Sequence, residues 1–131
     1  MARNRQTVAY LDTHIVVWLF AGLTKKLTER AKQAIENNEV VISQMSRLEL
    51  QYLFEIGRIT LKPERILNYL FKVINLKISS IPLNEIIDEA LKIGWTRDVF
   101  DRMLAAEARI TDNGFVTADE DIRSHLGQAI W

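Results

Sequence analysis

Two acidic residues directly follow short runs of β-forming residues. Asp12 ends the run 7–11, and Asp119 comes two residues after the run 115–117. In an open parallel sheet, ligands gather beyond the carboxyl ends of the strands, so both side chains are expected at the same edge of the sheet. For each of them, capping of the following helix is the alternative, and for a single Asp it is the more common role.

Two further acids are expected on inward helix faces. Glu49 shares a helical stripe with apolar residues, and Asp101 shares one with small and apolar residues. The residues on these stripes are Met45, Tyr52, Leu53 and Ile56 for Glu49, and Leu104, Ala105 and Ala108 for Asp101. Burying an ionised carboxylate costs several kcal/mol unless a metal, a cation or a proton compensates. One shared site explains all four acids more simply than four separate structural roles.

A carboxylate cluster of this kind predicts binding of a hard divalent cation. Mg²⁺ or Mn²⁺ prefers oxygen ligands and keeps several waters. Such an ion lowers the pKa of a bound water and neutralises charge that develops on a phosphodiester during in-line attack. The sequence leaves the number of ions open.

Other kinds of chemistry have little support in the sequence. There is no cysteine, no Gly-x-Ser-x-Gly nucleophile motif and no glycine-rich phosphate loop. His14 and His125 have no partners at zinc-ligand spacing, so we interpret both as packing or surface residues. Asp98 is expected to cap a helix or to pair with Arg102, with a further role at the rim of the site left open.

Basic residues near the acids are interpreted as ordinary surface charges. They are Arg47, Arg97 and Arg102, with Lys25 and Lys26 in a separate patch. The net charge is +0, from 17 basic and 17 acidic side chains, so a phosphate backbone would have to be bound by local patches. Asp121 and the basic residues before Thr7 are assigned no role.

The elements that position these residues alternate between short β-forming runs and amphipathic patterns. Strands are expected over 7–11, 39–43, 77–81, 115–117 and 129–131. Helices are expected over 28–38, from 43–46 to about 56, and over 63–73, 84–93, 99–110 and 119–125. This alternation predicts an α/β fold with a parallel sheet covered by helices on both faces.

The composition is that of one compact domain, expected to span residues 1–131. The chain is 48% hydrophobic and 26% charged, and no apolar run approaches the roughly 18 residues of a membrane span. No signal peptide is expected either. Without cysteines, redox chemistry gives no information on the compartment.

Four motifs in order along the chain resemble the PIN-domain family, specifically VapC-type toxins. They are Tyr-Leu-Asp-Thr-His, Ser-Arg-Leu-Glu-Leu, Val-Phe-Asp-Arg-Met-Leu-Ala-Ala-Glu-Ala and Val-Thr-Ala-Asp. The resemblance implies a PIN-like three-layer α/β/α sandwich with a short central parallel sheet. It places the metal-binding and catalytic acids of the family at Asp12, Glu49, Asp101 and Asp119.

The same resemblance implies Mg²⁺- or Mn²⁺-dependent endonucleolytic cleavage of RNA in the cytoplasm of a prokaryote. It also implies frequent homodimers and a small VapB-like antitoxin that wraps the toxin and can place a basic side chain near the acids. The hydroxyls of Thr13, Ser46 and Thr117 match polar positions of the motifs, where they orient carboxylates or waters, or cap helices. Val99 stands where related toxins often have proline, which is expected to loosen the entry to the helix.

Three alternatives remain open. A receiver-type signalling domain also holds Mg²⁺ at strand ends, but it leaves Glu49 and Asp101 unexplained. A PIN-like domain that no longer cleaves and acts as an interaction module is the second alternative, although all four acids are present. The third is a nuclease that cuts DNA or precursor ribosomal RNA, and no feature of the sequence excludes it.

Overall fold

The computed structural model of the protein describes residues 7–131, so the basic residues before Thr7 lie outside the described part of the chain. Five parallel strands form one sheet in the order β3-β2-β1-β4-β5. The strands are β1 (Val8–Leu11), β2 (Glu39–Ile42), β3 (Lys77–Ile78), β4 (Gly114–Val116) and β5 (Ala129–Ile130). Because all five run in one direction, their carboxyl ends meet at the same edge of the sheet.

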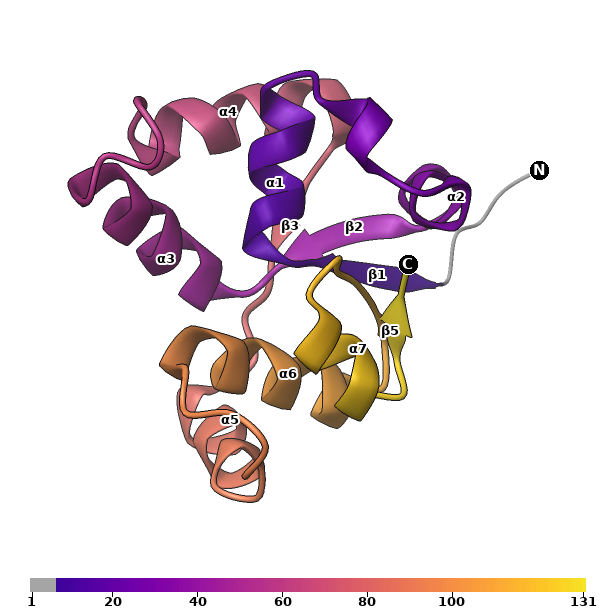
Figure 1. Ribbon diagram of the computed structural model, residues 1–131, viewed down its shortest axis with the longest axis vertical. Coiled ribbons are helices and arrows are strands. Elements are labelled where there is room, and N and C mark those ends of the chain that lie inside the picture. The colour runs from indigo at the N-terminus through magenta and orange to yellow at the C-terminus, as the bar shows by residue number, and fades with distance from the viewer. Residues whose placement is uncertain (1–6) are drawn as a thin grey trace.

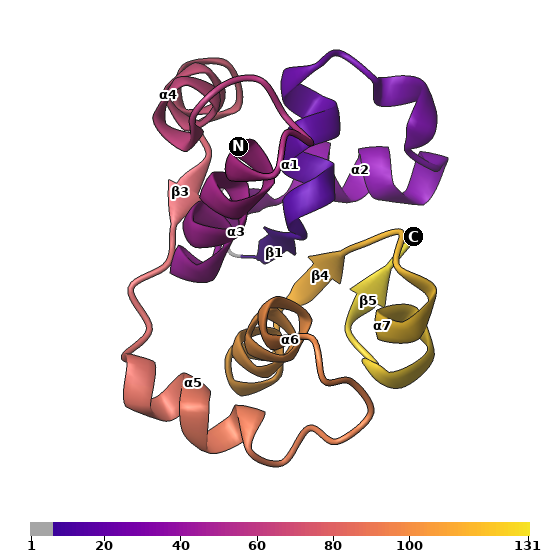
Figure 2. The ribbon, with the colours of Figure 1, turned by 60° about the vertical axis from the view of Figure 1, so that its left-hand side comes forward.

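Seven α-helices and one 3-10 helix connect and cover these strands in the described chain. They are α1 (Thr13–Phe20), η1 (Thr24–Lys26), α2 (Glu29–Asn37), α3 (Gln44–Glu55), α4 (Pro63–Ile74), α5 (Leu83–Ala90), α6 (Val99–Thr111) and α7 (Glu120–His125). Helices α1 to α4 lie on one side of the sheet and α5 to α7 on the other (Figures 1 and 2). The predicted three-layer α/β/α sandwich is confirmed.

The side chains of β1 show how the sheet separates two cores. Ala9 and Leu11 pack with α1 to α4, whereas Tyr10 packs into the second core with α5, α6 and α7. This alternation follows from the two-residue repeat of a strand. Both faces of the central strands are therefore buried, which is why their sequences are continuously apolar.

Several helix boundaries agree with the local signals in the sequence. The Ser43 hydroxyl accepts a hydrogen bond from the Met45 N–H at 3.0 Å and caps α3. Gly57 follows the end of α3 with φ of 80°, a backbone conformation that favours glycine. Pro63 is the first residue of α4, where its missing N–H costs no helical hydrogen bond.

The third strand is shorter than predicted, because it ends at Ile78 and not at residue 81. The Ser79 N–H still donates to the Ile42 carbonyl at 2.8 Å. Beyond Ser79 the chain leaves the sheet and reaches Pro82, the N-cap of α5. Proline has no N–H for a strand ladder, so the β-forming run does not extend the sheet.

Helix α5 is also shorter than predicted and ends at Ala90 instead of Ile93. The Lys92 and Ile93 N–H groups bond to carbonyls three residues earlier, at 3.0 and 3.1 Å. The chain therefore tightens into a turn, which buries Ile93. The sequence pattern placed this residue at the end of the helix.

One buried polar link holds α6 against the sheet. The Tyr10 hydroxyl on β1 donates to Glu107 Oε2 on α6 at 2.7 Å and lies 3.0 Å from Ser79 Oγ. Burial raises the pKa of Tyr10 to about 12, so the phenol stays a proton donor. The link fixes the helix that carries Asp101.

No helix within residues 7–131 is long and apolar enough to cross a membrane.

Candidate functional site

Asp12 lies at the carboxyl end of β1 with 3% of its surface exposed. Its backbone N–H continues the pairing with β4 by donating to the Val116 carbonyl at 3.0 Å. Oδ1 accepts from the Thr13 N–H at 2.8 Å, so the side chain does cap α1. Oδ2 accepts from the Thr117 hydroxyl at 2.7 Å, a contact that capping does not explain.

Asp119 follows β4 at the same edge and caps α7, since Oδ1 accepts from the Ile122 N–H at 3.0 Å. Its own N–H donates to Thr117 Oγ1 at 3.0 Å. One hydroxyl therefore donates to the carboxylate of Asp12 and accepts from the backbone of Asp119. The predicted convergence of these two acids at the edge of the sheet is present, and each acid also has the capping role that was its alternative.

Glu49 on α3 is half-buried, and its Oε1 is the one buried side-chain oxygen or nitrogen in the described residues that has no hydrogen-bond partner. The pKa of Glu49 is raised to about 7, mainly by burial and also by the negative charges of Asp12 and Asp98, although a hydrogen bond with Thr13 lowers it. A carboxyl in this state has lost water without gaining a cation or a full set of donors.

The stripe that singled out Glu49 is not a core stripe. Tyr52 and Ile56 are both 47% exposed, and the buried residues of α3 are Ser46 and Leu50. Helix α3 packs against α1, α4 and α6, and the half-exposed ring of Tyr52 lies 5.9 Å from that of Phe100 on α6. Glu49 is partly buried without belonging to either apolar core.

Asp101 lies in the first turn of α6. Burial raises its pKa to about 7, and the charges of Asp98, Asp12, Asp119 and Glu49 all raise it as well. The inward face predicted for it is present, since Leu104, Ala105 and Ala108 are buried. Four residues from β1, α3, α6 and the β4–α7 connection therefore act on one another through their charges.

Asp98 is a fifth acid whose charge acts on this cluster. Its Oδ1 accepts from the Asp101 N–H at 2.9 Å, which confirms the predicted cap and holds the helix entry at which Val99 stands. Arg102, the partner in the alternative to this cap, donates its Nε–H to the Ala90 carbonyl at 3.1 Å. The charge of Asp98 still raises the pKa of both Glu49 and Asp101, so it lies at the rim of the cluster.

His14 is a neighbour of the acids that the sequence did not reveal. Its Nδ1 lies 3.4 Å from Asp12 Oδ2, and its Nε2 accepts from the Ala118 N–H at 3.0 Å. The second contact joins residues 104 positions apart, so no local pattern predicts it. His125 is remote from this arrangement and stacks on Trp95 at 4.8 Å.

The chemistry of the cluster fits a hard divalent cation. Its donors are carboxylate and hydroxyl oxygens, and the unpartnered Oε1 of Glu49 is an available ligand atom. Among residues 7–131, however, no three His, Asp or Glu side chains are arranged to hold one ion as they stand. The cluster thus provides suitable donors and negative charge, while raised pKa values let protons offset the repulsion between the acids.

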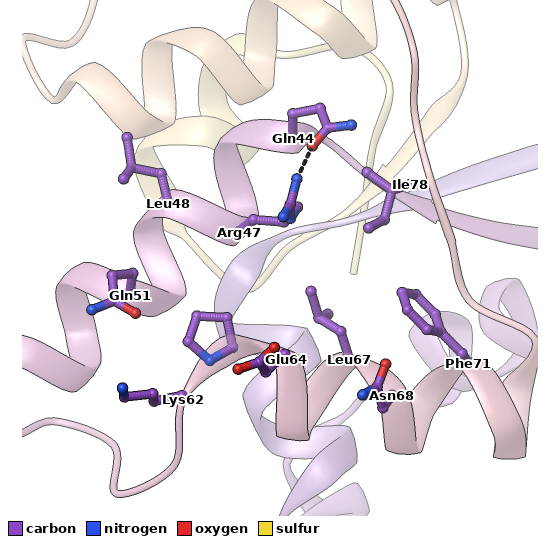
Figure 3. Close-up of a pocket in the computed structure, with 11 residues that line it drawn as sticks. Gln44, Arg47, Leu48, Gln51, Lys62, Glu64, Leu67, Asn68, Phe71 and Ile78 are labelled. Carbon is purple, nitrogen blue, oxygen red and sulfur yellow. Dashed lines mark hydrogen bonds between the residues drawn. The ribbon is translucent and has the colours of Figure 1, made fainter.

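A cleft of about 560 Å³ lies between α3, α4 and β3, on a different part of α3 from Glu49. Leu67, Phe71 and Ile78 form its apolar part (Figure 3). Arg47, expected beside the acids, lies in this cleft and donates to Gln44 Oε1 at 2.8 Å. Arg97, also expected beside the acids, donates to the Gly94 carbonyl.

The raised pKa values predict how stability depends on pH without metal. A carboxyl whose pKa is higher in the folded state than in the unfolded state stabilises the fold below the unfolded value and loses this contribution as pH rises through the folded value. With EDTA, the contribution of Glu49 and Asp101 to the free energy of unfolding should fall between about pH 4 and pH 8. Urea unfolding across this range measures it.

The double variant Glu49→Gln, Asp101→Asn is the control for this measurement. It should show a smaller loss of stability with rising pH than the wild type, because the two groups that bind the extra protons are gone. Identical pH profiles for both proteins would contradict the raised pKa values.

A family model described as the PIN domain matches residues 9–125. A comparison with curated proteins gave no match. Solved structures with the same fold include VapBC2 from Rickettsia felis bound to a DNA fragment from its promoter, 18% identical with a TM-score of 0.64 over 94% of this chain and 96% of that chain. A toxin-antitoxin complex from Klebsiella pneumoniae is 19% identical with a TM-score of 0.65, over the same shares of the two chains. PAE2754 from Pyrobaculum aerophilum is 20% identical with a TM-score of 0.60, over 94% of this chain and 87% of that chain.

Proposed function

Since this chain belongs to the PIN-domain family, a family of nucleases, we propose that it is a divalent-metal-dependent endoribonuclease and the toxin of a toxin-antitoxin pair. One observation carries the proposal. Asp12, Glu49, Asp101 and Asp119 converge from separate elements, and a buried oxygen of Glu49 has no partner. A purely structural cluster of this kind has a high cost in stability, because each acid disfavours the ionised form of the others.

The proposed centre consists of the four predicted acids, with Asp98 at its rim. When bound, Mg²⁺ or Mn²⁺ supplies charge neutralisation at the phosphodiester and lowers the pKa of water. Asp12 would be a fixed ligand, because Thr13 and Thr117 hold its two oxygens. Glu49 and Asp101 would complete the donor set, and their raised pKa values would make metal binding depend on pH.

A toxin needs a partner that silences it, and the α3–α4 cleft is our proposed contact surface. Leu67, Phe71 and Ile78 offer an apolar floor. Arg47 and Lys62 outnumber the single acid of the lining, Glu64, so the cleft has a net positive charge. An amphipathic segment with acidic residues complements such a cleft. The toxin-antitoxin complexes from Rickettsia felis and Klebsiella pneumoniae, which share the fold, support a partner of the antitoxin class.

We further propose that residues 1–131 act as one domain in the cytoplasm and form a homodimer. The exposed apolar side chains of Tyr52 on α3 and of Ile56 at its C-terminal cap offer a surface for a second copy. Sedimentation of the purified chain measures this state directly.

The substrate is tested with single strands of RNA and DNA of the same sequence, each incubated with the protein and Mn²⁺. We expect cuts within the RNA and little cleavage of the DNA. Equal or faster cutting of DNA would replace the ribonuclease proposal with a deoxyribonuclease. Cutting of neither strand, across a panel that includes structured and ribosomal precursor RNA, would favour an interaction module that no longer cleaves.

A further inference from the structure

His14 is the polar side chain beside the acids for which the proposed function gives no role. It is the second residue of α1 and lies between Asp12 and the segment that leads to Asp119. Its Nε2 accepts from the Ala118 N–H at 3.0 Å, and its Nδ1 lies 3.4 Å from Asp12 Oδ2. The ring therefore bridges the ends of β1 and β4.

The contact with Ala118 indicates which nitrogen of the neutral ring carries the proton. A nitrogen that accepts a hydrogen bond from a backbone N–H carries no proton, so Nε2 is bare and the proton is on Nδ1. This N–H is on the side of Asp12 and places a positive dipole beside its carboxylate. Neither nitrogen is then free to bind a metal ion or to remove a proton from water.

Aromatic packing holds this ring in place. His14 lies against Trp18 one helical turn later, with 5.0 Å between ring centroids. Trp18 is held in turn by Trp131 at 6.2 Å and has Lys26 Nζ 5.1 Å from its ring centroid. The orientation of the imidazole is thus fixed by a tilted contact with Trp18 on one side and a backbone hydrogen bond on the other.

We propose that His14 is a positioning residue that ties the carboxylate of Asp12 to the backbone beside Asp119, and so orients these two acids toward one divalent cation. Thr117 makes the same connection through its hydroxyl, so the two residues bind Asp12 Oδ2 together. The inference rests on the proposed function, because it assigns Asp12 and Asp119 to one cation. Partners that orient ligands in this way typically contribute about 10- to 100-fold to metal affinity.

Three substitutions of His14 test its contacts with Asp12 and Ala118 one at a time. His14→Phe keeps a ring against Trp18 but removes both nitrogens. His14→Asn places an amide N–H near the position of Nδ1 and keeps a donor for Asp12, whereas His14→Gln reaches toward Ala118 and loses that donor. The affinity for Mn²⁺ alone is measured from the electron paramagnetic resonance signal of the free ion, and urea unfolding with EDTA checks the fold.

We expect His14→Phe to fold and to bind Mn²⁺ about 10-fold more weakly than the wild type. His14→Asn should recover part of this loss, and His14→Gln should recover less. Wild-type affinity in a folded His14→Phe variant would overturn the inference. Equal affinities in the Asn and Gln variants would overturn the role given to the Nδ1 proton.

Nitrogen-15 NMR of the metal-free protein tests the protonation state independently of metal and activity. The spectrum should show a proton on Nδ1 of His14 and none on Nε2, and the opposite tautomer would overturn the inference. A wild type that binds no Mn²⁺ and cuts no RNA would overturn the proposed function together with this inference. A wild type that binds and cuts, beside an unaffected His14→Phe, would overturn this inference alone.

Discussion

Replacing Asp101 with Asn should lower the rate of metal-dependent RNA cleavage at least about 100-fold, because a metal contributes several kcal/mol of charge stabilisation and each 1.36 kcal/mol is a factor of ten. The fold should survive, since the Asp98 cap bonds to the backbone N–H of residue 101 and not to its side chain. Removing a charge that Asp98, Asp12, Asp119 and Glu49 all oppose should even stabilise the metal-free protein. Cleavage rates at saturating Mn²⁺, with urea unfolding of the same preparations, test both statements.

Asp88→Asn is the matched control, because it makes the same chemical change at an exposed position of α5. It should cleave at the wild-type rate. A folded Asp101→Asn variant that cuts as fast as this control would remove Asp101 from the active site, and an unfolded one would show that the acid is structural.

Binding of Mn²⁺ should raise the free energy of unfolding by about 2.7 kcal/mol when the free ion is at 100 times its dissociation constant. The ion binds the folded cluster and screens acids that repel one another, whereas the unfolded chain offers no assembled site. Glu49→Gln should remove most of this increase, because it neutralises the carboxylate whose Oε1 is buried without a partner. Urea unfolding at matched concentrations of Mn²⁺ or EDTA gives both numbers.

The same variant should be more stable than the wild type in EDTA at pH 8, where Glu49 is ionised at a cost to the fold. Glu55→Gln, on the same helix but exposed and bonded to Gln51, is the control and should keep the full response to Mn²⁺. Equal stabilisation of all three proteins by Mn²⁺ would mean that the ion binds away from Glu49.

Most of the fold was predictable because its signals are local. The apolar runs that became β1, β2 and β4 are buried on both faces, and their sequences contain this information directly. The extents of β3 and α5 were not predictable, because they depend on where the chain leaves the sheet at Ser79 and where a helix tightens around a buried Ile93. These are tertiary effects, which a local pattern does not contain.

The candidate site was likewise predictable only where its signals are local. Asp12 and Asp119 follow strands, so the rule for parallel sheets brings them together without any structure. Glu49 was selected for a stripe on which Tyr52 and Ile56 proved to be exposed, so the stripe did not predict its surroundings. The motif already gave Thr117 the expected role of orienting a carboxylate, and its hydroxyl donates to Asp12. The role of His14 depends on a contact across 104 residues, which spacing in the sequence does not reveal.

The most direct test of the central claim is cleavage of an end-labelled RNA by protein stripped of metal with EDTA, dialysed and then titrated with Mn²⁺ or Mg²⁺. We predict no cutting before the titration, internal cuts that increase to saturation as the ion is added, and no cuts with Asp101→Asn at any concentration. Cutting by the stripped protein in EDTA, or equal cutting by wild type and variant, would contradict a metal-dependent nuclease centred on these acids.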